Sequence, residues 1–216
     1  MESPFCAGDD PDFRLIETFG YVPGQGARVA RLDLHLARMA RSATAFGIPF
    51  DAKGASRLVA GLCGSVPLRC RMTLAADGAL DLATSPMPPA VPLWRFAIAE
   101  ARLEADDPML QHKTTRRALY DQVRRDLPAG VQEMVFLNTR GELCEGTITN
   151  IALTTAQGDR LTPPLASGCL PGIYRQSLLE AGALREAVLT MDDLRQARQI
   201  HLMNALRGQI PARLGA

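Results

Sequence analysis

Lys113 is a candidate for carbonyl chemistry because of the residues that follow it. The stretch "KTTRRALYDQVRRDLPAG" predicts a helix, in which Thr114 or Thr115 caps the first turn and a proline and a glycine end it. Lys113 would then lie at or just before the positive end of the helix dipole, where an ammonium ion is disfavoured. A lysine that loses its proton easily can react with a carbonyl group as a neutral amine. The alternative is a solvated basic residue on a charged face.

Glu145 is a candidate anion in "EMVFLNTRGELCEGTITNIALTT", which predicts a hairpin that turns at Arg140 and Gly141. Strand alternation places Glu145 on one face together with Leu143, Thr147, Thr149, Ile151 and Leu153. A carboxylate there would need a cationic or proton-donating partner if it were buried. Gly146 could host a bulge and change that register. The alternative is a surface glutamate beside a turn.

Two further segments could bind anions. "GCLPGIYR" feeds a Pro-Gly turn into a helix and exposes the backbone amides of Ile173 and Tyr174, which suit a phosphate. "MNALRG" ends a strand in a turn of small residues with Arg207, which could bind a carboxylate. The alternatives are an ordinary helix start and a solvated arginine.

The composition excludes several classes of protein. The 216 residues carry 24 basic and 23 acidic side chains, and no block of one sign predicts a nucleic-acid or membrane surface. The sequence has three histidines and five scattered cysteines, which argue against a disulfide framework and against a metal site: Cys6, Cys63, Cys70, Cys144 and Cys169. No apolar stretch is long enough to span a bilayer. The sequence predicts a soluble, cytoplasmic globular protein that binds neither nucleic acid nor a membrane.

The elements that must position these residues fall on two sides of a proline-rich stretch, "SPMPPAVP" at 85–92, which predicts a linker. The first domain, 1–84, has a strand at 13–21, followed by a turn at 23–27. An amphipathic helix at 31–47 and a hairpin that turns at Asp77 and Gly78 complete it. This pattern is typical of a small α+β layer domain.

The second domain, 93–216, carries the remaining elements. A strand at 94–101 precedes the helix after Lys113 and the hairpin around Glu145. A helix is predicted from near Gly172 to Gly182, and then a strand, a short helix capped by Thr190, and a last strand that ends at a turn. The fold class is α+β, in two domains.

Four of these segments, "KTTRRALY", "NTRGELCEGTITNIAL", "LTPPLASGCLPGIYRQ" and "HLMNALRGQIP", resemble the class IV aminotransferases. This family depends on pyridoxal 5′-phosphate and contains branched-chain aminotransferases, D-amino-acid aminotransferases and aminodeoxychorismate lyases. The resemblance covers Phe13 to Pro211. It implies a small N-terminal α/β layer domain, a larger C-terminal domain with a barrel-like sheet, and a homodimer.

The resemblance also implies roles for individual residues. Lys113 matches the lysine that binds the cofactor covalently, and Glu145 matches the carboxylate that keeps the pyridine nitrogen protonated. Arg38, in "HLARM", matches the arginine that binds the cofactor phosphate. The remaining matches concern the same phosphate.

Ile173 and Tyr174 match the helix-start amides on the phosphate, and Ala205 matches a second phosphate-binding turn in which relatives often carry threonine. Asn204 and Arg207, in the same turn, are the tentative substrate-binding residues. Two departures from the family are visible. About two strands that usually precede "FRLIETF" in the family are absent or reduced. The tyrosine that some members place shortly after the lysine is not in the same register here, and Tyr120 is the nearest one.

The ending "MNALRGQIP" resembles the lyases more than the aminotransferases, which tend to carry a Ser/Gly-Thr turn there. The resemblance therefore implies conversion of 4-amino-4-deoxychorismate to 4-aminobenzoate, a precursor of folate, and pyruvate, with Lys113 as the general base. The alternatives are an aminotransferase of branched-chain or D-amino acids, and a cofactor-binding protein without activity. Retention of both Lys113 and Glu145 argues against the last.

Overall fold

The computed structural model describes residues 10–24 and 28–215. The chain divides into two compact units, described here one at a time: unit 1 contains residues 1–89 and 112–116, and unit 2 contains residues 90–111 and 117–216. The predicted turn at 23–27 and Cys6 fall wholly or partly outside the described residues. Within the described part of the chain, no helix combines the length and the apolar character needed to cross a membrane.

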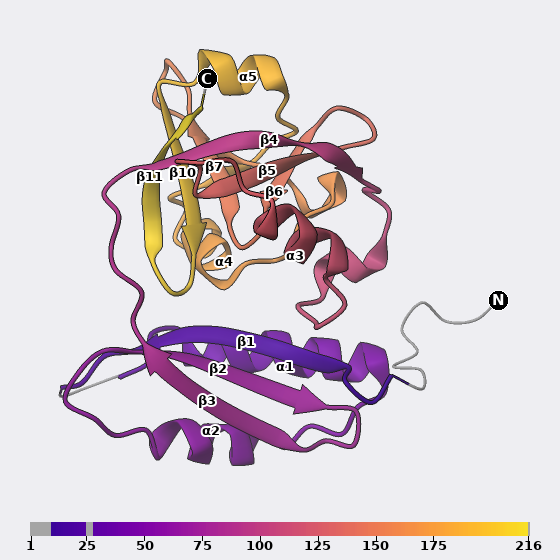
Figure 1. Cartoon of the computed structure of the whole chain (residues 1–216), viewed down its shortest axis with the longest axis vertical. Helices are drawn as coiled ribbons and strands as arrows, with labels where there is room; N and C mark the ends of the chain where they lie inside the picture. The colour runs from indigo at the N-terminus through magenta and orange to yellow at the C-terminus, as the bar shows by residue number, and fades with distance from the viewer. Residues whose placement is uncertain (1–9, 25–27, 216) are drawn as a thin grey trace. The chain divides into compact units, whose positions relative to one another are not determined.

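Unit 1 is a three-stranded antiparallel sheet with two helices (Figure 1). The strands lie in the order β1-β2-β3, and the elements are β1 (Arg14–Tyr21), α1 (Leu32–Phe46), α2 (Ala52–Ala60), β2 (Leu68–Ala75) and β3 (Leu80–Pro86). The predicted strand, long helix and hairpin are confirmed. Helix α2 was not predicted, because it is short, contains a glycine and buries only two side chains.

The predicted turns of unit 1 form for the expected reasons. Gly47 ends α1 in the left-handed conformation at φ 66°, which glycine adopts without steric cost. Gly78 takes φ 88° between β2 and β3, and the Asp77 side chain accepts a hydrogen bond of 2.9 Å from the Ala79 amide. Leu15, Glu17, Phe19 and Tyr21 alternate along the buried face of β1, and Ile16 is buried as well. The Phe19 ring lies 5.3 Å from the His35 ring of α1.

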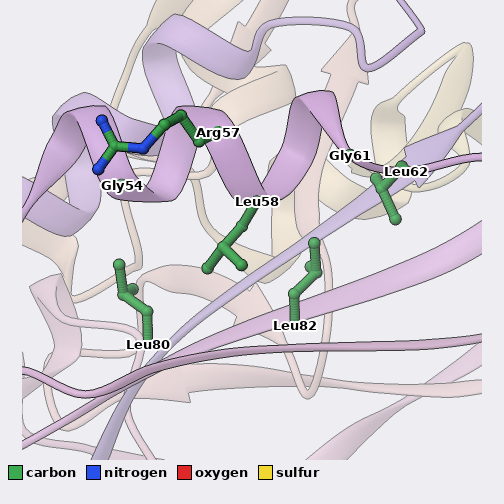
Figure 2. A pocket seen from close by; sticks show the side chains of 7 residues that line it. All are labelled: Gly54, Arg57, Leu58, Gly61, Leu62, Leu80 and Leu82. Carbon is green, nitrogen blue, oxygen red and sulfur yellow. The ribbon is translucent and has the colours of Figure 1, made fainter.

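An apolar pocket of about 650 Å³ opens in unit 1 between α2 and β3 (Figure 2). Leu58 and Leu62 face it from α2 and its C-terminal end, and Leu80 and Leu82 face it from β3. No residue that the sequence predicts as a site residue lines this pocket, and its only charged lining residue is Arg57, which is paired with Asp51. It is therefore not the candidate site.

Unit 2 is built on a mixed eight-stranded sheet in the order β10-β11-β4-β5-β6-β7-β8-β9. Its strands are β4 (Trp94–Leu103), β5 (Glu133–Asn138), β6 (Leu143–Gly146), β7 (Asn150–Thr154), β8 (Arg160–Thr162), β9 (Arg185–Glu186), β10 (Gln199–Asn204) and β11 (Gly208–Leu214). Because β10 also pairs with β7, six strands close into a barrel, as the resemblance implies (Figure 1). Its apolar core includes Phe96, Val135, Leu143, Ile151 and Leu202.

Unit 2 also contains short helical elements between its strands. They are the 3₁₀ turns η1 (Pro108–Gln111) and η2 (Leu165–Ser167), and the helices α3 (Ala118–Arg125), α4 (Ile173–Glu180) and α5 (Met191–Gln196). The predicted start of α4 after Gly172 and the Thr190 cap of α5 are confirmed, the latter as a capping box with Asp193. Strand β11 was not predicted.

Two predictions about the strands and helix near the candidate residues are wrong. The stretch 143–153 is not one strand: β6 ends at Gly146, the chain reverses, and β7 starts at Asn150, which pairs with Glu145. Helix α3 starts at Ala118, five residues after Lys113, and no side chain caps it. Lys113 is therefore not at the positive end of that helix.

Residues 112–116 belong to unit 1 although they follow the first 22 residues of unit 2. The Ile16 amide donates to the Lys113 carbonyl at 2.8 Å, and Thr115 exchanges two backbone-directed hydrogen bonds with Arg14. The hydroxyl of Thr115 is thus used on β1 and that of Thr114 on the Arg116 amide, so neither caps a helix. The predicted division placed this segment, with Lys113, in the second domain.

Candidate functional site

Glu145 is a buried carboxylate near the end of β6, with 6 % of its surface exposed. The Tyr120 hydroxyl donates to its Oε1 at 2.9 Å, and the Leu170 amide donates to its Oε2 at 3.0 Å. These are the proton-donating partners that a carboxylate in a barrel wall requires.

The groups around Glu145 are held in their neutral forms. Burial, and after it the negative charge of Glu145, raise the pKa values of the Tyr120 phenol and the Cys144 thiol far above their ordinary range. The same two causes raise the pKa of Cys169 to about 12. Tyr120 therefore remains a hydrogen-bond donor to Glu145 at any physiological pH.

Glu133 fixes the turn that follows Glu145, and sequence reasoning did not select it. Its side chain is fully buried and accepts hydrogen bonds from the amide and hydroxyl of Thr147, the amide of Ile148 and the hydroxyl of Thr149. A Cβ atom at Gly146 would collide with the Glu133 and Thr149 side chains, so only glycine fits there. The Glu133 carboxylate thus satisfies backbone and side-chain donors of the turn that do not pair with a strand.

The loop before α4 is tied to the same strands. The Asn150 side chain donates to the Leu170 carbonyl at 2.9 Å, and the Leu170 amide is the donor to Glu145. A Cβ atom at Gly172 would collide with the Asn150 side chain, so the chain can approach β7 closely only because residue 172 is glycine. Ile173 and Tyr174 then form the first turn of α4.

The turn between β10 and β11 joins this group through Asn204. Its side chain donates to the Ile148 carbonyl at 3.3 Å and accepts from the Arg207 amide at 2.9 Å. The Arg207 guanidinium lies 5.3 Å from the centre of the Trp94 ring and is half-buried, which differs from the solvated alternative. Gly208 lies against the Tyr174 ring, so this turn, with Ala205 in it, adjoins the start of α4.

Unit 2 therefore brings together six of the eight predicted site residues around two turns and one helix start: Glu145, Ile173, Tyr174, Asn204, Ala205 and Arg207. The other two, Arg38 and Lys113, lie in unit 1.

Arg38 takes part in a buried cluster with Glu17 and His35. Its Nε and Nη2 atoms donate to the two oxygens of Glu17 at 2.8 and 2.7 Å, and His35 Nδ1 lies 2.6 Å from Glu17 Oε2. Burial alone would raise the pKa of Glu17, but the Arg38 charge and the hydrogen bonds from His35 and Arg38 lower it to about 2. Glu17 was not selected from the sequence, because its partners lie 18 and 21 residues away.

Strand β1 supports both predicted cofactor residues of unit 1. Ile16 binds the backbone of Lys113, and the next residue, Glu17, binds the side chain of Arg38. His112 is fixed from α1, since its Nδ1 atom lies 2.9 Å from the Ser42 hydroxyl. Lys113 thus projects from an ordered extension of the sheet, not from a free loop.

We expect the Glu17 cluster to make unit 1 sensitive to acid. Because the folded pKa is depressed, the stabilisation is fully present above the unfolded value of 4.5 and is lost as the pH falls towards 2. The shift corresponds to about 3 kcal/mol. Glu17→Gln should therefore be less stable near neutral pH and should lose less stability on acidification.

Urea unfolding at about pH 6 and about pH 2.5 measures this difference. The other carboxylates titrate in both proteins. The difference between wild type and variant in the free energy of unfolding lost between the two pH values therefore isolates Glu17. Parallel stability curves would contradict the prediction.

Comparison with known proteins agrees with this architecture. The family model described as "Amino-transferase class IV" matches residues 14–214. An aminodeoxychorismate lyase of Saccharomyces cerevisiae is 29 % identical over 135 residues, covering 54 % of this chain and 36 % of its own. A Schizosaccharomyces pombe protein assigned by inference as such a lyase is 34 % identical over 107 residues, covering 47 % of this chain and 46 % of its own.

The match to these curated relatives thus spans less than half of their length. Among solved structures, a Mesorhizobium loti protein assigned by inference as an amino-acid aminotransferase is 37 % identical with a TM-score of 0.86, covering 94 % of this chain and 100 % of its own. The family model and the six-stranded barrel lead to one conclusion: the chain belongs to the class IV aminotransferase family.

Proposed function

We propose that this chain is a pyridoxal-phosphate-dependent lyase that converts 4-amino-4-deoxychorismate to 4-aminobenzoate and pyruvate. The observation that carries the cofactor assignment is Glu145, a buried carboxylate with one fixed donor on each oxygen. The lyase names of two curated relatives and the Asn-Ala-Leu turn at 204–206 support the reaction.

The residues present fit pyridoxal phosphate. A buried carboxylate suits a protonated pyridine nitrogen, because the two charges compensate each other outside water. The first turn of α4 and the adjoining Ala205 turn offer backbone amides, which suit a phosphate group. Gly172, the residue before α4, has no side chain that would cover the start of the helix. Arg38 is the basic side chain assigned to the same phosphate.

When bound, pyridoxal phosphate withdraws electrons from the carbon that bears the substrate's amine. Lys113 then acts as the general base and removes the ring proton at that carbon. Glu145 keeps the pyridine nitrogen protonated, and Asn204 and Arg207 lie in the turn assigned to the substrate. Loss of this proton and cleavage of the C–O bond to the enolpyruvyl group would leave an aromatic ring, which is 4-aminobenzoate, and the released enolpyruvate takes up a proton to become pyruvate.

An aminotransferase is the second candidate, favoured by the Mesorhizobium loti protein that matches along its whole length. Lys113 would again take a proton from the carbon that bears the amine but would return it at a different carbon. Residues that hold the cofactor therefore do not separate the two reactions. The difference lies in the substrate that the turn at 204–207 accepts.

One assay distinguishes the candidates. The purified protein, supplied with pyridoxal phosphate, is incubated with enzymatically prepared aminodeoxychorismate, and separately with branched-chain or D-amino acids plus 2-oxoglutarate. We expect 4-aminobenzoate and pyruvate from the first mixture. In the second mixture we expect no keto acid formed from the added amino acid. The reverse pattern would establish the aminotransferase, and product from neither would leave the protein without the proposed activity.

Arg207 is expected to bind a carboxylate of the substrate. Arg207→Ala removes a half-buried guanidinium that is held in place by Trp94. Loss of one charge-assisted contact should lower kcat/KM by about ten- to a hundredfold, mainly through KM. The affinity for the cofactor should not change.

Steady-state kinetics and cofactor titration measure the two effects. Arg95→Ala, which removes an exposed arginine from β4 beside Trp94, is the matched control and should behave as the wild type. Wild-type kinetics in Arg207→Ala would move the carboxylate contact elsewhere.

A further inference from the structure

Tyr120 occupies a defined position relative to Glu145. It is the third residue of α3, and its hydroxyl donates to Glu145 Oε1 while the Leu170 amide donates to Oε2. One donor on each oxygen fixes the plane of the carboxylate. These two bonds hold Glu145 from the helix on one oxygen and from the loop before α4 on the other.

The position of the Tyr120 hydroxyl is itself determined by packing. The ring lies edge-to-face on Phe136 at 5.1 Å, within a buried cluster that includes Leu103 and Cys144. Arg117, at the N-terminal end of α3, lies 5.7 Å from the centre of the Tyr120 ring.

The start of α3 is also tied to the chain just after Glu145. Arg117 donates to the Thr147 carbonyl at 3.0 Å, two residues beyond Glu145. Helix α3 and the end of β6 are therefore held together at two points, one on the carboxylate and one on the backbone. These two contacts place the Tyr120 hydroxyl against Glu145.

We infer that Tyr120 is a positioning residue that keeps Glu145 oriented and ionised against the pyridine nitrogen of the cofactor. This inference rests on the proposed function. A hydrogen bond from a phenol stabilises the charged carboxylate. Without it Glu145 becomes more basic, so the proton that it shares with the pyridine nitrogen moves towards the carboxylate, and the nitrogen loses its charge.

Tyr120→Phe tests the inference with little risk to folding, because it removes one oxygen and keeps the packed ring. The protein is loaded with pyridoxal phosphate labelled with nitrogen-15 on the ring, and the NMR shift of that nitrogen reports its protonation. Tyr21→Phe is the matched control, since the Tyr21 hydroxyl donates to the Gly64 carbonyl, at 3.3 Å, in unit 1. Glu145→Gln gives the reference for loss of the charge.

We expect the nitrogen signal of Tyr120→Phe to lie between those of the wild type and Glu145→Gln, and that of Tyr21→Phe to match the wild type. With the substrate that the wild type turns over, kcat should fall about tenfold with KM unchanged. A merely structural role for Tyr120 would leave the nitrogen shift at its wild-type value.

A wild-type signal in Tyr120→Phe, beside a displaced signal in Glu145→Gln, would overturn the inference and leave the proposed function intact. A wild type that binds no cofactor, or a Glu145→Gln variant with the wild-type signal, would instead overturn the proposed function and this inference with it.

Discussion

Lys113→Ala is expected to abolish both turnover and covalent fixation of the cofactor. The lysine is proposed to supply the amine that bonds to the cofactor and the base that takes the substrate proton. Loss of a positioned base alone costs about 10²- to 10⁴-fold in rate, and loss of the covalent attachment adds to this. We therefore expect a fall in kcat of about 10⁴-fold or more.

The chain makes this experiment unusually clear because it contains only two lysines, Lys53 and Lys113. Borohydride reduction of the wild type should place the cofactor on Lys113, as peptide mass spectrometry can establish. Lys53→Ala is the matched control: this residue is exposed on α2, and its variant should be labelled and active as the wild type. An adduct on Lys53, or none in cofactor-saturated protein, would contradict the assignment.

Glu145→Gln is expected to lower kcat by about a hundredfold or more while the cofactor stays bound. Glutamine keeps the shape of the side chain but cannot hold the pyridine nitrogen in its charged form. Its amide has only one accepting oxygen, so its NH₂ group faces one of the two donors, Tyr120 or Leu170, which loses its acceptor.

Stopped-time assays and a cofactor titration separate rate from binding in this variant. Glu100→Gln, an exposed position on β4, is the control and should retain wild-type kcat. Unchanged turnover in Glu145→Gln would mean that this carboxylate does not act on the cofactor.

Local patterns predicted the elements whose stability is local. The helix at 31–47 and the hairpin with Asp77 and Gly78 follow from periodicity and turn chemistry, and both are present. The barrel could not be derived from such patterns, because its closure pairs β7 with β10, about fifty residues apart in the chain. The resemblance, not the periodicity, supplied it.

The errors have physical causes in particular residues. Thr114 and Thr115 have the residue type of helix caps, but their hydroxyls accept hydrogen bonds from other backbone amides. The Thr115 hydroxyl binds the Arg14 amide of β1, and the Thr114 hydroxyl binds the Arg116 amide. Alternation across 143–153 failed because Glu133, ten residues upstream, fixes a reversal there. Buried carboxylates such as Glu133 are not visible in a sequence, since the groups that satisfy them come from elsewhere in the chain.

The pairing of residues 112–116 with β1 has a consequence for how the protein is made. Unit 1 lacks one edge of its sheet until the ribosome has synthesised the first 22 residues of unit 2, because the segment that covers β1 follows them in the chain. Until then β1 presents unpaired backbone groups, the feature by which exposed strands associate with other chains. The proline-rich stretch marks a boundary in the sequence, but unit 1 is not complete when synthesis has reached it. A fragment that ended there would keep the unpaired edge of β1.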